Sequence, residues 1–225
     1  AGQFVAYAQR EKLEMVSAFP RQHTESFFEK VLLPYAFALY FTGVNADRVN
    51  SAVSREALAN GQCLLIRRDT YRRLGGHGAV ATSIIEDVAL ARRAKRHGVH
   101  ARVIRAEAYG HARMYENLGA IWRGFEKNSF RFLLVNPLSG AIVVTASIVL
   151  TSYLPVLASL LATGNWVAAA GFAVLPGLAL WPWYGGARAI ALTPVAIYLF
   201  QAIALTAMCK TLARRKTNWK GRPVG

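Results

Sequence analysis

The chain has 225 residues, 54% of them hydrophobic, and a formal net charge of +15. This length holds one large domain or two small ones. Its two cysteines, Cys63 and Cys209, lie far apart and have no partners at metal-ligand spacing, which excludes a disulfide framework and a zinc motif and favours reducing surroundings.

Charge is distributed unevenly along the sequence. All twelve acidic residues precede Pro137, Arg188 is the one charged residue between Pro137 and Cys209, and the residues after Cys209 are basic without an acid. The chain therefore divides into a charged front, an apolar membrane block and a basic tail. Beside a membrane block, the positive charge favours anionic lipid headgroups and an anionic ligand over nucleic acid.

The start of the chain predicts a helix followed by a strand. Apolar residues at helical spacing indicate a helix over 3–13, and 14–19 is a strand candidate that ends at Pro20 before a polar loop over 21–24. Residues 45–59 predict a loop or short helix that covers the site described next.

Residues 27–44 are crowded with aromatic side chains and interrupted by Pro34. They are too short and too aromatic for a convincing membrane span, and they predict a helix that lies at the membrane interface. A buried core helix is the alternative.

The central stretch predicts a strand, a short helix, a loop and a second helix. A turn at Asn60 and Gly61 opens a buried strand over 63–66. Asp69 then predicts the N-cap of a short helix, which stops at the glycine pair of positions 75–76.

The second helix of this stretch is expected from about Ser83 to Gly98. Glu86 lies three residues after Ser83, as in a capping box, and Asp87 falls in the first turn. A carboxylate there faces the open end of an α/β sheet, where such folds bind ligands, so Asp87 is the best acid or base candidate. Helix capping by Asp87 and Glu86 is the alternative.

The second half of the chain predicts interface and membrane helices. A strand is expected over 99–106 and an amphipathic, aromatic and basic helix over 116–134. Three apolar segments follow, over 138–161, 166–184 and 189–209, and each is about long enough to cross a hydrocarbon core ~30 Å thick. Three spans would place the front and the basic tail on opposite sides, so either one segment is re-entrant or the tail breaks the positive-inside rule.

Several short motifs share the pattern of one enzyme family. They are Asn60-Gly61-Gln62, Arg67-Arg68-x-x-Tyr71, Gly75-Gly76-His77, Glu86-Asp87-x-x-Leu90, Arg113-Met114-Tyr115, Trp122-Arg123-Gly124 and the closing Trp219-Lys220-Gly221-Arg222. Together they resemble membrane-bound glycosyltransferase family 2, especially the hopanoid- and carotenoid-type lipid glycosyltransferases and more distantly ceramide glucosyltransferase and cellulose synthase.

The resemblance implies an α/β fold with a partial Rossmann-like domain of the glycosyltransferase A type. It assigns 1–115 to the C-terminal part of the catalytic domain, with 27–44 as an interfacial helix, 116–136 to an amphipathic interface helix, 137–209 to about three transmembrane helices and 210–225 to a basic tail. The family's early Asp and its Asp-x-Asp metal motif have no counterpart here. The chain is therefore expected to be a fragment without the nucleotide-binding half.

The resemblance also implies roles for particular side chains. The family's later Asp takes the proton of the acceptor hydroxyl, and Asp87 matches it, with Glu86 as the second catalytic candidate. The candidates for substrate binding are Asn60, Gly61, Gln62, His77, Arg113, Trp122 and Arg123, the last two where the family's Gln/Arg-x-x-Arg-Trp motif is degenerate. A divalent cation, Mg or Mn, is expected from the family, with no ligand for it in this chain.

Each substrate-binding candidate has a structural alternative. The Asn-Gly-Gln stretch is also a plain turn, the glycine pair a helix stop, and His77 a solvated loop side chain. The alternative role is anchoring at the membrane interface, with Arg113 and Arg123 as snorkelling arginines and Trp122 as a belt tryptophan.

The implied function is an inverting transfer of a sugar from a nucleotide sugar to a membrane-lipid hydroxyl, with the fragment alone inactive. The expected partners are the donor, the lipid acceptor and the bilayer, without nucleic acid. The expected location is the cell inner membrane, multi-pass, with the catalytic part facing the cytoplasm. The alternative is a non-enzymatic membrane protein or subunit with a transferase-like lobe.

Overall fold

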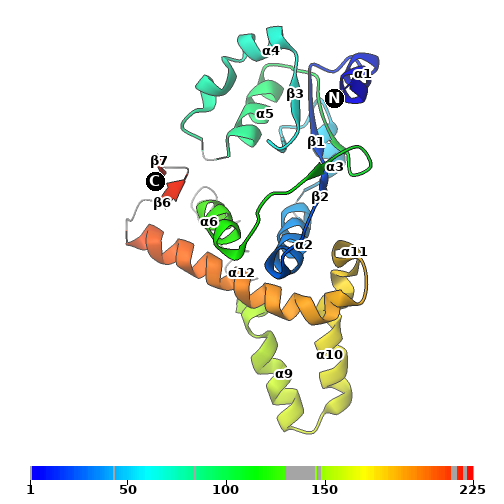
Figure 1. The fold of residues 1–225 in the computed structure, drawn as a ribbon, viewed down its shortest axis with the longest axis vertical. Helices are drawn as coiled ribbons and strands as arrows, with labels where there is room; N and C mark the ends of the chain where they lie inside the picture. Colours follow the sequence, from blue (N-terminus) through cyan, green and yellow to red (C-terminus); the bar gives the residue numbers. More distant parts are fainter. Residues whose placement is uncertain are drawn as a thin grey trace. The chain divides into compact units, whose positions relative to one another are not determined.

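The computed structural model describes residues 2–42, 44–83, 85–129, 145, 148–213, 217–219 and 222–224 (Figure 1). The fold is mixed α/β, about 62% helical, with a small mixed sheet. The α/β class expected from the sequence is confirmed at this level. The chain forms two compact units, of which the first contains Ala1–His23 and Gly43–Met114 and the second contains Thr24–Thr42 and Tyr115–Gly225.

The first unit is built on a three-stranded sheet in the order β3-β1-β4. Strand β1 pairs antiparallel with β3 and parallel with β4, and a separate parallel pair joins β2 to β5. The elements of this unit are α1 (Gly2–Arg10), β1 (Met15–Phe19), β2 (Arg21–Gln22), α3 (Ala46–Asn50), β3 (Leu64–Ile66), α4 (Arg68–Arg73), the 3-10 helix η1 (Gly76–Val80), α5 (Glu86–Arg96), β4 (Ala101–Arg105) and β5 (His111–Ala112).

Both faces of β1 are covered, because all five of its residues are buried. Successive side chains of a strand point to opposite faces. Met15 packs on one face in a cluster with Leu90, Ala91 and Ala94 of α5. Val16 packs on the other face, with Ala8 of α1. The sheet is therefore a middle layer between α5 and α1.

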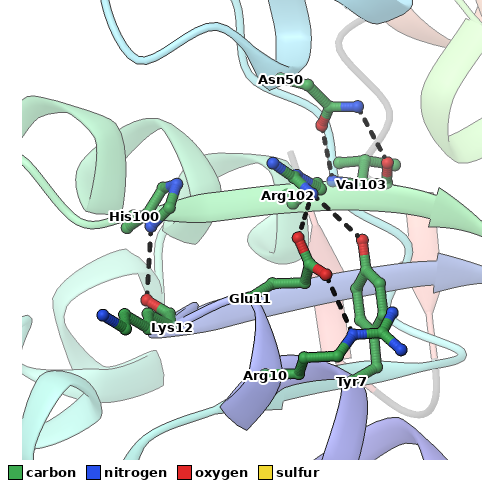
Figure 2. Close-up of polar contacts among 8 residues, drawn as sticks. All are labelled: Tyr7, Arg10, Glu11, Lys12, Asn50, His100, Arg102 and Val103. Carbon is green, nitrogen blue, oxygen red and sulfur yellow. Dashed lines mark hydrogen bonds and ion pairs between the residues drawn. The ribbon is translucent and has the colours of Figure 1, made fainter.

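Polar contacts hold α1 and α3 onto β4 (Figure 2). Arg102 of β4 donates from Nη1 to Tyr7 Oη at 3.3 Å and to Glu11 Oε2 at 3.2 Å. The side chain of Asn50, at the end of α3, bonds to the backbone of Val103. These contacts join segments that lie far apart in the sequence.

Three details of the predicted elements are wrong. The loop expected over 21–24 contains β2, whose pairing partner β5 lies far along the chain. Asp69 is not the N-cap of α4, because helical bonding begins at Arg67, whose carbonyl accepts from Tyr71 N at 2.8 Å. Ser83 forms no capping box.

The reason for the missing capping box lies in the turn that precedes α5. Ser83 N donates to Val80 O at 2.9 Å, so Ser83 ends the η1 turn instead of starting the helix. Helix α5 begins at Glu86 after Ile85, with no side-chain cap. Asp87 nevertheless lies in the first turn of α5, as predicted.

In the described residues of the second unit, the secondary structure is helical apart from one short antiparallel strand pair. Its elements are α2 (Phe27–Thr42), α6 (Leu118–Ser129), α9 (Tyr153–Ala162), α10 (Trp166–Ala179), α11 (Trp181–Tyr184), α12 (Arg188–Leu212), β6 (Thr217–Trp219) and β7 (Arg222–Val224). Its core combines residues of α2, α6, α11 and α12: Val31, Leu32, Tyr35, Ile121, Tyr184, Ala189, Ala196, Ile197 and Ile203. Helix α2 thus packs as the buried-helix alternative describes, while Phe27, Leu39 and Tyr40 stay exposed.

The apolar segments form helices of different lengths. Helix α9 has 10 residues and α10 has 14, whereas Arg188–Lys210 is, among the described residues, the one helix long and apolar enough to cross a membrane. Most of 138–147 and the end of the helix expected over 116–134 lie outside the described residues. The length and composition of this helix are weak evidence that the protein associates with a membrane.

Candidate functional site

The carboxylate of Asp87 is held against the turn that precedes β3. Gly61 N donates to Asp87 Oδ2 at 2.7 Å, and Val88 N donates to Oδ1 at 2.8 Å. Leu90, three residues further along α5, is fully buried and fixes the helix on the sheet. The half-buried Asp87 therefore points at the 60–62 turn rather than freely into solvent.

The 60–62 turn is itself fixed to the central strand. Asn60 N donates to Ser17 Oγ at 2.7 Å, and Ser17 Oγ donates to Asn60 O at 3.3 Å. Within the turn, Gln62 N donates to Asn60 Oδ1 at 3.0 Å, which is an Asx-turn contact. A Cβ on Gly61 would make an ordinary van der Waals contact with Asp87 Oδ2, at 3.4 Å, so the carboxylate packs closely against this turn.

Two residues that sequence reasoning missed complete this arrangement. Gln22 of β2 donates from Nε2 to Gln62 Oε1 at 2.9 Å. Ser17 is 1% exposed, and a hydroxyl in the middle of a buried strand was a signal that it had a polar partner. No comparable signal pointed to Gln22, because its partner lies 40 residues away.

His77 is tied to Tyr71 instead. Its backbone N donates to Tyr71 Oη at 3.0 Å, and the same hydroxyl lies 2.7 Å from His77 Nδ1. Gly76, at φ +56°, makes room for this contact, because a Cβ there would lie 2.7 Å from the Tyr71 ring. His77 remains exposed at the surface of the first unit.

The other predicted site residues are spread over both units. Glu86 and Arg113 are exposed in the first unit. Trp122 and Arg123 belong to α6 of the second unit, where Trp122 packs half-buried against the core and Arg123 is exposed. The structure thus brings together Asp87, Gly61, Asn60 and Gln62.

The described residues do not fit a metal site. Within them, no group of three His, Cys, Asp or Glu side chains is placed to hold an ion. Both oxygens of Asp87 accept backbone N–H groups. Among the described residues, the divalent cation implied by the family resemblance therefore has no ligand set.

A small surface hollow in the first unit lies beside α3 and β4, lined by residues that include Ser17, Lys95 and Arg102. Lys95 Nζ donates to three backbone carbonyls of the neighbouring segment, those of Arg48, Ser51 and Ser54, at 3.0 to 3.3 Å. Desolvation lowers the pKa of Lys95, against the opposing charge of Glu56. Lys95 thus holds the 48–54 segment in place.

No protein-family model, curated protein or solved structure matches this chain.

Proposed function

We propose that this chain is the acceptor-side part of an inverting, family 2-like glycosyltransferase that transfers a sugar from a nucleotide sugar to a membrane-lipid hydroxyl. The observation that carries the proposal is the 2.7 Å bond from Gly61 N to Asp87 Oδ2. It joins two motifs of the resemblance, Asn-Gly-Gln and Glu-Asp, across 26 residues of sequence.

Asp87 keeps the capacity to act as a base in this arrangement. An ionised carboxylate offers about four lone-pair positions, and the two backbone N–H groups use two of them. A lipid hydroxyl can therefore donate to a remaining position on the half-buried carboxylate. The bonds to Gly61 and Val88 fix the direction in which that lone pair points, which general base catalysis requires.

The proposed reaction is a single displacement. Asp87 takes the proton of the acceptor hydroxyl as the hydroxyl oxygen bonds to the anomeric carbon, and the bond from that carbon to the diphosphate oxygen breaks. Arg113 and Arg123 are the candidates for contacts with the leaving diphosphate, because a guanidinium matches phosphate oxygens. Trp122 is a candidate through the motif resemblance alone. The ligands of the divalent cation would then be supplied by residues other than Asp87, Arg113, Trp122 and Arg123.

The apolar helices support a membrane-bound acceptor. The second unit carries α12 and a large exposed apolar surface. The proposal places the protein at the cell inner membrane, with Asp87 on the cytoplasmic side. The donor is a soluble nucleotide sugar, so only the acceptor needs access from the bilayer.

The test compares the wild type with Asp87→Asn and Asp69→Asn, each as the complete reading frame in detergent. Asp69 is a matched control, because it is an exposed carboxylate in the first turn of α4. Release of nucleoside diphosphate is followed from a panel of nucleotide sugars with membrane lipid extract and a divalent cation. We expect the activity of Asp87→Asn to be roughly 10²- to 10⁴-fold lower than that of the wild type. The activity of Asp69→Asn should match the wild type.

One observation favours a second candidate, a non-enzymatic membrane subunit. Two backbone bonds to Asp87 are also what a purely structural tie between α5 and the turn requires. This candidate predicts no release from any variant, while Asp87→Asn loses thermal stability relative to Asp69→Asn. Equal release by all variants would show that Asp87 is not the base, while the protein would still be a transferase.

A further inference from the structure

Helices α9 and α10 form a helical hairpin with a tight turn (Figure 1). Gly164, at φ +71°, reverses the chain, and Asn165 N donates back to Leu160 O at 2.9 Å. The two helices are joined along their length by Tyr153, whose ring stacks on Phe172 and whose hydroxyl donates to Ala173 O at 2.8 Å. The hairpin is therefore one structural element.

The surface of this hairpin is apolar on its outer sides. Residues 148–187 contain no Asp, Glu, Lys or Arg. The large apolar side chains exposed along it are Ile148, Val149, Leu154, Val156, Leu161, Trp166, Val167, Leu175 and Leu178. Trp166 and Val167, next to the turn, are 66% and 87% exposed. A soluble protein rarely leaves such a contiguous surface in water, and hydrocarbon is the partner that its chemistry fits.

The hairpin is too short to cross a bilayer and return. At 1.5 Å per residue, α10 is about 21 Å long. Of the other arm, the described helical stretch 148–162 is about 22 Å long. The hydrocarbon core is ~30 Å thick. A hairpin of this length ends inside the core.

Helix α12 lies across the base of the hairpin at a steep angle, with α2 and α6 on its other side (Figure 1). Phe200 of α12 contacts Tyr35 of α2 and Phe125 of α6, with ring centroids 5.5 and 5.4 Å apart. If the hairpin stands along the membrane normal, α12 lies near the plane of the interface. Its length then runs along the surface instead of through the bilayer.

Charges at both ends of α12 agree with that orientation. Arg188 begins the helix, and Lys210 near its end lies 2.5 Å from Glu126 of α6, a buried carboxylate whose charge it balances. A spanning α12 would separate these two cations by about 33 Å, on opposite faces of the bilayer. An interfacial α12 keeps both cations at the same leaflet. Trp181 and Trp183, each 41% exposed, lie between α10 and α12 at the level of an aromatic belt.

We infer that the α9–α10 hairpin inserts into the bilayer from one side, while α2, α6 and α12 lie at the interface of that side. The front and the basic tail then face the same compartment. This arrangement satisfies the positive-inside rule, which three full crossings would break. It goes beyond the proposed enzyme activity and holds for a non-enzymatic subunit as well.

The test measures which side of the membrane each segment faces. Single cysteines replace three exposed residues in a Cys63→Ser, Cys209→Ser background of the complete reading frame: Ala52→Cys in the front, Thr163→Cys at the hairpin turn and Ala213→Cys in the tail. A membrane-impermeant maleimide is applied to intact spheroplasts and to inverted membrane vesicles. We expect positions 52 and 213 to react in inverted vesicles only, and position 163 to react only after detergent is added.

Two results would overturn the inference. Labelling of positions 52 and 213 from opposite sides would show an odd number of crossings. Labelling of position 163 from the outer face would show that the hairpin crosses completely.

A second measurement uses a protein with its native cysteines. Wild type, Trp166→Phe and Trp183→Phe are reconstituted with lipids brominated near the headgroup or near the chain end. The difference between wild type and Trp166→Phe gives the emission of Trp166, which should be quenched mainly by the deep bromines. The difference between wild type and Trp183→Phe gives the emission of Trp183, which should be quenched mainly by the shallow bromines. Equal shallow quenching at both positions would place the hairpin along the surface and contradict the inference.

Discussion

The side-chain amide of Asn50 pairs with both backbone groups of Val103 (Figure 2). Asn50 Nδ2 donates to Val103 O at 3.0 Å, and Val103 N donates to Asn50 Oδ1 at 2.7 Å. Strand β4 is at the edge of its three-stranded sheet, so the amide occupies backbone groups that a neighbouring strand would otherwise bind. One side chain thus protects the middle of an edge strand.

Substitution of Asn50 should open this edge. Asn50→Ala removes both bonds, and we expect the Val103 amide to exchange with solvent faster, by an amount equivalent to about 1–2 kcal/mol of lost protection. Hydrogen exchange measured by mass spectrometry or NMR gives the rate. Asp47→Asn, an exposed change in the same helix, should leave it unaltered. Unchanged exchange in Asn50→Ala would mean that the amide does not protect β4.

Substitution by alanine should have different effects on stability at two glycines of η1. Gly76 has φ +56° and a Tyr71 ring 2.7 Å from the position of a Cβ, whereas no atom lies within 4 Å of a Cβ on Gly78. We expect Gly76→Ala to lose about 1–3 kcal/mol of unfolding free energy through backbone strain and the clash. Gly78→Ala should change it by less than about 0.5 kcal/mol. Urea unfolding measures both, and equal effects would contradict the local geometry.

Tyr71 should set the tautomer of His77. The Tyr71 hydroxyl accepts from His77 N. We expect its own proton to be donated to Nδ1, 2.7 Å away, so that neutral His77 carries its proton on Nε2. Nitrogen-15 NMR of the imidazole should show a protonated Nε2 in the wild type and a mixture of tautomers in Tyr71→Phe. A dominant Nδ1–H form in the wild type would refute the assignment.

Glu14 should make the first unit sensitive to acid. Hydrogen bonds from Thr70 Oγ1 and His100 N, together with Arg73, lower the pKa of Glu14 below its usual 4.5, against opposing desolvation. A lowered pKa contributes stability that is present above the unfolded value and lost as the pH falls through the folded value. Urea unfolding at about pH 7 and about pH 3 should show a smaller loss in Glu14→Gln than in the wild type. Equal losses would show that Glu14 is not responsible.

The crossing of α10 and α12 should depend on Gly177. A Cβ at that position would overlap the backbone of Ile190, whereas Gly171 in the same helix has open space around its Cβ position. Gly177→Ala should therefore lower the thermal unfolding temperature in detergent, and Gly171→Ala should not. If both variants unfold alike, the helices do not approach this closely at Gly177.

Local patterns predicted the elements of the first unit better than their pairing. The strands β1 and β3 and the position of Asp87 in its helix depend on neighbouring residues, and these predictions are confirmed. The burial predicted for β3 is wrong, because its three residues are only partly buried. Strand order and direction depend on contacts across many residues, such as Met15 with Ile66 and with Ala101. No periodicity of a single segment contains that information.

The same limit applies to the candidate site. Spacing indicated Asp87 and, separately, the turn at Gly61, but the bond between them appears only when α5 packs beside β3. The Ser83 prediction was wrong because two turns compete for that residue, and the bond to Val80 O wins. Capping rules describe a helix start in isolation, whereas here the preceding 3-10 helix decides it.

The bond from Tyr184 Oη to Val31 O, 2.6 Å long, joins positions 153 residues apart. A ribosome that adds roughly 5–20 residues per second needs about 8–30 s to make the intervening chain. During that interval, the newly made α2 has none of its partners from α11 and α12. This apolar helix is exposed until its partners are made, and in the membrane arrangement proposed above the bilayer surface is the nearest place that can cover it. Translation close to the membrane would therefore protect the chain from aggregation before its own core exists.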